Sequence, residues 1–324
     1  MQMIGRLVTS FWFRAGLSAT ILAILVSQLD QRGAMRALVG VDLRYLFGAI
    51  VVDAAARATM IARWALLIRS SGAPISDWSV ARIFLITSFV GTALPAGGAD
   101  VTRAYSLARH TANGREAIAS VAVDRLLGVS ALLTLGIVGL TLGTPDAELP
   151  LARLVAGLSL ATAAALCVSF WADRLLRLAL PKRLQRTPLG QWLVRVADGI
   201  GAYRGRRRTL ASVFCLSLLV QWLRIIGVFL LGTGLGLGVG LGYYLIFMPI
   251  ALLVFMLPLS IAGIGLPQGA IVWLLGQIGV PYASSFALST LVVAVGMLGT
   301  LPGLWLYLSS RGKEMHAGRS IGAR

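Results

Sequence analysis

Residues 118–143 read IASVAVDRLLGVSALLTLGIVGLTLG, an apolar run in which Asp124 and Arg125 are the only charged residues. A helix of about 20 apolar residues is long enough to cross the hydrocarbon core of a bilayer. Similar apolar runs occupy residues 8–29, 45–68, 151–171, 209–234 and 284–309. The sequence therefore predicts an all-α polytopic membrane protein with about six to eight transmembrane helices.

The composition supports this class. Hydrophobic residues make up 57% of the 324 positions and charged residues 13%, which is too apolar for an ordinary soluble domain. The apolar runs leave no room for a separate soluble catalytic domain, so residues 1–324 are expected to form a single integral-membrane domain. The net charge of +17 could indicate nucleic acid, but the basic residues lie between the apolar runs. Membrane topology accounts for them without a nucleic-acid partner.

Loop charges predict the orientation of the chain. Basic residues are concentrated before the first run, in segment 172–208 and in the C-terminal tail, whereas loop 144–150 carries two acidic residues and no base. The positive-inside rule then places both termini in the cytoplasm of a bacterial inner membrane. Leucines and tryptophans among the ten basic residues of 172–208 favour amphipathic helices on anionic lipid, although a solvated loop explains the charges equally well.

Two further apolar stretches are interrupted by proline and glycine. Leu94-Pro95-Ala96-Gly97-Gly98 breaks the stretch 82–96, and Leu257-Pro258 with Gly263-Ile264-Gly265 breaks the stretch 242–279. Non-helical backbone at membrane depth must be buried in protein or line a wet cavity. The first stretch is expected to be a re-entrant hairpin, because arginines flank both of its ends. The second is either a hairpin or two spans.

A weak internal symmetry relates these two stretches. Arg63-Trp64 precedes the first break, and Trp222-Leu223-Arg224 precedes the second at a similar distance. This spacing predicts repeat halves at 1–150 and 151–310. If the helices that carry the two tryptophans run in opposite directions, the repeat is inverted, as in many secondary transporters.

The glycines of the first break are followed by charges. Gly97 and Gly98 would let backbone amides approach an anion closely, and Asp100 and Arg103 share a face if a helix begins there. Two interpretations remain open at this point. These residues bind an anionic group, or Asp100 caps a helix whose arginine is an ordinary surface residue.

Other charges lie inside the apolar runs themselves. Asp124, Arg125 and Arg224 are candidates for function because intramembrane charges are costly and usually face a cavity or each other. For Asp124 and Arg125 the alternative is snorkelling to the interface. Asp53 and Arg57 lie four residues apart, so a pair within one helix could account for them.

Residues that would support metal, cofactor or disulfide chemistry are sparse. Cys167 and Cys215 lie in apolar runs, and the two histidines are flanked by basic residues. Neither arrangement has the spacing of metal ligands. We expect no metal, no cofactor and no disulfide.

Taken together, these motifs resemble the lysylphosphatidylglycerol synthase transmembrane, or flippase-like, family. The resemblance rests on Arg63-Trp64, on Leu-Pro-x-Gly-Gly-x-Asp-x-x-Arg at 94–103, on Asp-Arg-x-x-Gly at 124–128 and on Leu-Pro-x-Ser-x-x-Gly-x-Gly at 257–265. It implies a helical membrane domain with re-entrant helices that flips or transports lipid. The sequence departs from the pattern at 266–268, where Leu-Pro-Gln stands in place of an expected basic-acidic pair.

The resemblance and the charges predict a lipid flippase or transporter that moves a phospholipid or a lipid-linked molecule of polyprenyl-phosphate or hopanoid type. Intramembrane arginines would hold the phosphate headgroup. The predicted substrate-binding residues are Arg63, Pro95, Gly97, Gly98, Asp100, Arg103, Asp124, Arg125, Arg224, Gly263 and Gly265. The alternatives are a membrane enzyme or accessory subunit for headgroup modification, although no catalytic nucleophile is evident, and a scaffold of a lipid-modifying complex. A lipid-synthesising enzyme is a candidate partner.

Overall fold

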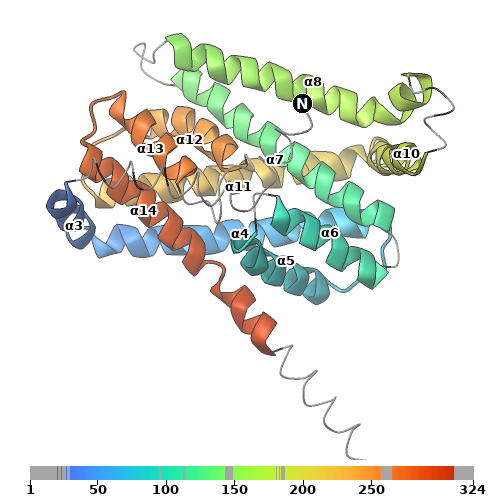
Figure 1. Cartoon of the computed structure of the whole chain (residues 1–324), viewed down its shortest axis with the longest axis horizontal. Coiled ribbons are helices and arrows are strands. Elements are labelled where there is room, and N and C mark those ends of the chain that lie inside the picture. The colour runs from blue at the N-terminus through green and yellow to red at the C-terminus, as the bar shows by residue number, and fades with distance from the viewer. Residues whose placement is uncertain are drawn as a thin grey trace, which may run out of the picture.

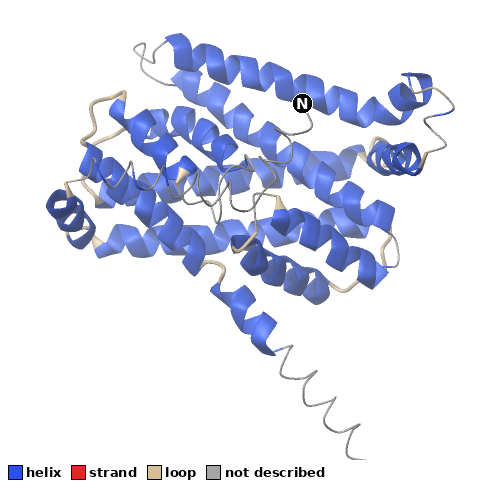
Figure 2. Cartoon of the chain, viewed as in Figure 1, coloured by secondary structure: helices blue, strands red, loops and turns tan. Residues whose placement is uncertain are grey.

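The fold is that of a computed structural model, which describes residues 30–94, 97–111, 114–142, 149–179, 187–256 and 265–309 together with isolated positions 20, 23, 27, 181 and 183. The described residues form helices and turns, with no strand among them (Figure 2). This confirms the predicted all-α class. Of the candidate site residues, Pro95 and Gly263 lie outside the described residues.

Two long helices run side by side through the centre of the molecule, α4 (Leu43–Ser71) and α11 (Arg207–Gly234) (Figure 1). They are antiparallel, because the Asp42 backbone amide donates to the Gly234 carbonyl at one end and the Tyr203 hydroxyl donates to the Leu67 carbonyl near the other. Burial raises the pKa of Tyr203 to about 12. The antiparallel pair provides the frame for the other helices.

Further long helices complete the set of spans. These are α7 (Gly114–Leu142), α8 (Leu149–Ala179) and α14 (Tyr282–Leu298), with α14 followed by a turn and a helical segment at 301–309. With α4 and α11 they make five helical regions of the described chain that are long and apolar enough to cross a membrane. The chain is therefore a multi-pass membrane protein. The span predicted at 8–29 falls almost entirely outside the described residues.

The first interrupted stretch forms two short helices, α5 (Asp77–Thr92) and α6 (Gly98–Thr111), which pack against each other. Ser76 caps α5, its side chain accepting from the Ser79 amide. A methyl group on Gly98 would overlap the Leu94 side chain, and one on Gly91 would overlap Ala99. Gly98 is thus a packing residue at the break, where α5 and α6 come together.

The second interrupted stretch also contains two short helices, α12 (Leu241–Met256) and α13 (Leu266–Gly276). The described part of each is shorter than the roughly 20 residues that a full span needs, and the choice between a hairpin and two spans stays a prediction. Gly265 has a φ of +98° at the start of α13, a conformation that favours glycine, and its amide donates to the Gln268 side chain. Gln268 therefore caps a helix where the family pattern expects a charged pair.

Segment 172–208, expected to form amphipathic helices or a solvated loop, is largely helical in its described part. Residues 172–179 continue α8, and the separate helix α10 (Pro188–Gly201) packs on α7 and α8. Ala197 and Ile200 of α10 are buried against the protein. The prediction placed the end of α8 too early, because the arginines near its end resemble a loop by composition although they sit in continuous helix.

The order of the elements recurs along the chain. A long helix, two short helices and a long helix occupy 43–142, and the same order occupies 207–309, while α3 (Gln31–Val39) lies beside α14 and α8 follows one edge (Figure 1). The antiparallel arrangement of α4 and α11 is the one that an inverted repeat requires. The repeat halves themselves stay a prediction.

Candidate functional site

A cavity of about 480 Å³ lies between the central helices and α5, α6, α7, α12 and α14. Its lining includes eight charged residues, which come from four helices: Asp53, Arg57, Arg63, Asp100, Arg103, Asp124, Arg125 and Arg224. Five arginines and three aspartates give the lining a formal charge of +2 (5 − 3). Such charges inside a membrane domain are costly unless they are paired or meet a charged ligand.

Arg63 of α4 and Asp124 of α7 form the most deeply buried ion pair of the cavity. The Arg63 Nη2 to Asp124 Oδ2 distance is 2.7 Å, and the two side chains are 5% and 6% exposed. Arg63 Nη1 also donates to the Ser217 hydroxyl of α11 at 3.0 Å. Arg63 thus ties three helices together, and Asp124 does not snorkel to an interface.

Gly128 explains the last position of the Asp-Arg-x-x-Gly motif. Its Cα faces the Arg63 guanidinium, which a side chain at this position would meet at 3.5 Å. Its carbonyl accepts a 3.0 Å hydrogen bond from Gln221 Nε2 of α11. One turn of α7 therefore supplies both the counter-ion of Arg63 and a backbone carbonyl that binds α11.

Arg103 of α6 is buried without a hydrogen bond among the described residues. Its guanidinium carbon lies 4.2 Å from the ring centre of Phe84 and 5.4 Å from that of Trp64. The nearest carboxylate, Asp100, is 3.7 Å away, too far for a hydrogen bond. Arg103 Nε is buried and has no partner. Aromatic faces hold this cation in place and leave its donors available for an anion.

Asp100 and Arg125 link the motif at 94–103 to the motif at 124–128. Arg125 Nε donates to Asp100 Oδ2 at 2.5 Å, and the Arg125 side chain is 43% exposed. Neighbouring residues of a helix point in different directions, so Asp124 and Arg125 reach different partners and do not pair with each other. Asp100 lies between Arg103 and Arg125 and faces both.

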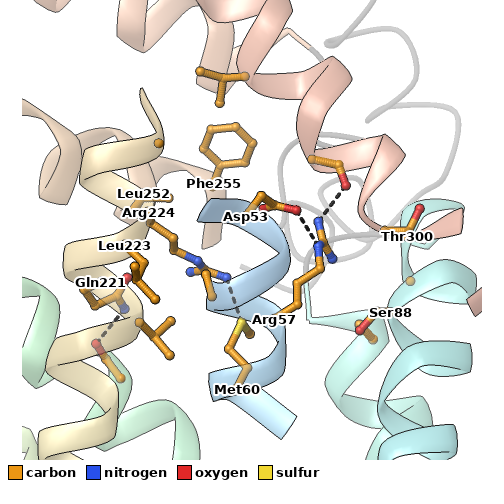
Figure 3. Close-up of a pocket in the computed structure, with 18 of the residues that line it drawn as sticks. Asp53, Arg57, Met60, Ser88, Gln221, Leu223, Arg224, Leu252, Phe255 and Thr300 are labelled. Atoms are coloured by element: carbon orange, nitrogen blue, oxygen red, sulfur yellow. Dashed lines mark hydrogen bonds and ion pairs between the residues drawn. The ribbon is translucent and has the colours of Figure 1, made fainter. Parts of the chain in front are cut away.

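Asp53 and Arg57 form a second ion pair further along α4, with an Oδ2 to Nε distance of 2.6 Å. Arg57 Nη2 also donates to the Gly296 carbonyl of α14 at 2.6 Å. Figure 3 shows Arg57 directed from α4 toward α14, the helix that precedes Thr300. The pairing within α4 predicted from the spacing is confirmed, and the structure adds that the pair lines the cavity and contacts α14.

Substituting Gly299 by alanine is expected to disturb this pair. A methyl group there would overlap the Arg57 guanidinium and the Asp53 carboxylate, so either the pair or α14 must move. Overpacking of this kind typically costs about 1–3 kcal/mol. Thermal unfolding of purified Gly299→Ala should show the loss.

Gly296→Ala is the matched control, because nothing lies within 4 Å of a methyl group at Gly296 and its carbonyl is retained. Equal melting temperatures for the two variants would contradict the packing described at Gly299.

Arg224 of α11 is the remaining cation of the cavity. It is half-buried, and its only hydrogen bond among the described residues is the 3.4 Å contact of Nη2 with the Met60 sulfur. Figure 3 shows its side chain pointing from α11 toward Met60 of α4. A thioether is a weak acceptor, so the Arg224 charge is not neutralised by a carboxylate of the described chain.

The cavity brings together seven of the predicted site residues, namely Arg63, Gly97, Asp100, Arg103, Asp124, Arg125 and Arg224. Gly98 and Gly265 do not line it; they shape the helix ends. Gly97 has a φ of +87° just before α6. Sequence reasoning missed the cavity positions of Asp53, Arg57 and Gln221. Two opposite charges in the middle of run 45–68 were the available signal for the first two.

Metal ligands were not expected, and the described residues contain no group of three or more His, Cys, Asp or Glu side chains able to hold a metal ion. Cys167 and Cys215 are both free and exposed. The polar groups of the cavity are instead arginines, carboxylates and amides.

Fold and cavity together define a polytopic α-helical membrane protein with a positively charged cavity between its helices. The model of one protein family, described as the lysylphosphatidylglycerol synthase TM region, matches residues 11–303. The chain belongs to this family, which confirms the resemblance based on the motifs. Comparison with curated proteins gave no match.

Proposed function

We propose that this chain moves a phosphate-bearing lipid, either a phospholipid or a lipid-linked molecule of polyprenyl-phosphate or hopanoid type, across the bacterial inner membrane. The observation that carries the proposal is the excess of two positive charges in a cavity between membrane-spanning helices. A phosphate group would supply the missing negative charge, and guanidinium groups suit phosphate oxygens.

Arg103 is the first headgroup ligand in this proposal. The Phe84 and Trp64 rings fix its guanidinium, so little side-chain entropy is lost when it binds. Asp100, held by Arg125, orients it from one side. Such an arrangement suits reversible binding of a phosphate group.

We also propose how the chain is oriented in the membrane and which surface contacts lipid headgroups. With both termini in the cytoplasm, the Ser71 end of α4 and the start of α11 lie on the cytoplasmic side. Arg207 and Arg208 are exposed there, beside the α8–α10 corner. We infer that this surface contacts anionic lipid headgroups, which attract juxtamembrane basic residues. A lipid-synthesising enzyme on this side would supply the cargo.

Reconstitution into vesicles tests the function. The purified chain should accelerate the exchange of fluorescent phosphatidylglycerol or a labelled polyprenyl phosphate between leaflets, and it should leave fluorescent ceramide, which lacks a phosphate, at the rate of protein-free vesicles. Acceleration of the ceramide alone, or of none of the three probes, would contradict the proposal.

A further inference from the structure

The charges of the cavity lie at two levels along α4. Arg57 is 14 residues from each end of the helix, and Arg63 is six residues closer to Ser71. At 1.5 Å per residue, the two levels are about 9 Å apart. We call the level that contains Arg63, Asp100, Arg103, Asp124 and Arg125 the Arg103 cluster, and the level that contains Asp53, Arg57 and Arg224 the Arg224 cluster.

Each cluster carries one surplus positive charge. The Arg103 cluster has three arginines and two aspartates, so its formal charge is +1 (3 − 2), and the Arg224 cluster has two arginines and one aspartate, again +1 (2 − 1). A phosphodiester carries one negative charge. Either cluster could therefore neutralise one phosphodiester headgroup, and the two clusters line a single cavity.

The surplus charge of the second cluster belongs to Arg224. Arg57 is held by the Asp53 carboxylate and by the Gly296 carbonyl, whereas the recorded partner of Arg224 is the Met60 sulfur. Figure 3 shows the two arginines with Asp53 and Met60 between α11 and α14. An arginine at mid-helix without a carboxylate partner among the described residues is costly inside a membrane, which points to an anionic ligand.

We propose that Arg224 forms a second phosphate-binding station near the middle of the membrane, which receives the headgroup from Arg103 during translocation. The inference rests on the proposed function. A headgroup that crosses a core of about 30 Å without a second ligand would have to leave Arg103 for uncharged surroundings. Leaving Arg103 for uncharged surroundings would create a high free-energy barrier. A second cation about 9 Å away divides that barrier into two smaller ones, as sequential binding sites do in ion pores.

A comparison of binding with flipping tests the station. Phosphatidylglycerol binding to the detergent-solubilised full chain is measured by native mass spectrometry, and flipping is measured in phosphatidylglycerol-containing vesicles. Arg103→Gln should weaken binding by at least about tenfold, the effect of one lost charge-assisted hydrogen bond, and should slow flipping as well. Arg224→Gln should leave binding within about twofold and slow flipping by at least about tenfold.

Two control variants separate the effect of losing the Arg224 charge from an effect on folding. Arg109→Gln removes an exposed arginine that belongs to neither cluster and should match the wild type in both measurements. Arg224→Lys keeps the charge and should restore flipping to within a few fold. Loss of binding in Arg224→Gln equal to that in Arg103→Gln, or undiminished flipping in Arg224→Gln, would overturn the second station and leave the proposed function standing. A wild-type chain that neither binds nor flips the lipid would overturn both.

Discussion

Replacing Asp124 by leucine should lower the free energy of unfolding more than any other single change in the cavity, by about 3–5 kcal/mol. The substitution removes the carboxylate that neutralises Arg63 and leaves a guanidinium that is 5% exposed among α4, α7 and α11. The Ser217 hydroxyl alone cannot compensate for that charge. Thermal and denaturant unfolding of the purified chain would measure the loss.

The double variant Arg63→Met with Asp124→Leu is the informative control. Removing both charges avoids the unpaired cation, so the double variant should be more stable than Asp124→Leu alone. A double variant as unstable as the sum of the two single variants would show that the pair acts through packing and not through charge compensation.

The second large effect is expected on transport. Arg103→Gln should slow lipid flipping by at least about tenfold, because the variant loses the buried cation whose donors are unoccupied. The cost to folding should be small, about 1 kcal/mol, since Arg103 makes ring contacts but no hydrogen bond to the described residues. Flipping in vesicles, at matched protein abundance, measures the effect.

Arg109→Gln is the matched variant, because Arg109 is exposed on the same helix and touches only the Tyr105 ring among the described residues. It should flip lipid at the wild-type rate. An Arg103→Gln variant that flips as fast as Arg109→Gln would remove Arg103 from the site.

The long helices could be predicted from the sequence because each needs a continuous apolar run of fixed length. Runs 45–68 and 209–234 correspond to α4 and α11 within a few residues. The end of α8 could not be predicted, since Arg174 and Arg177 look like loop residues by composition. The helix boundaries inside stretch 242–279 were equally inaccessible, because charge counting places the following chain on the same side of the membrane for a hairpin and for two spans.

Most of the charged residues that line the cavity could be predicted from the sequence, but the ion pairs that they form could not. Intramembrane charges identified Asp124, Arg125 and Arg224 without a structure. Which carboxylate pairs with which arginine depends on how the helices are rotated and packed against each other. In the structure, Asp124 pairs with Arg63 and Asp100 pairs with Arg125, and both pairs join different helices. Spacing within one helix predicts only local pairs such as Asp53 with Arg57.

The proposed function requires that the charged cavity hold a lipid phosphate. An experimental structure of the full chain in phosphatidylglycerol-containing nanodiscs would test this. We expect a phosphate inside the cavity, with an oxygen about 3 Å from the Arg103 guanidinium. A cavity that holds no lipid phosphate, with headgroups bound only at the α8–α10 surface, would contradict it.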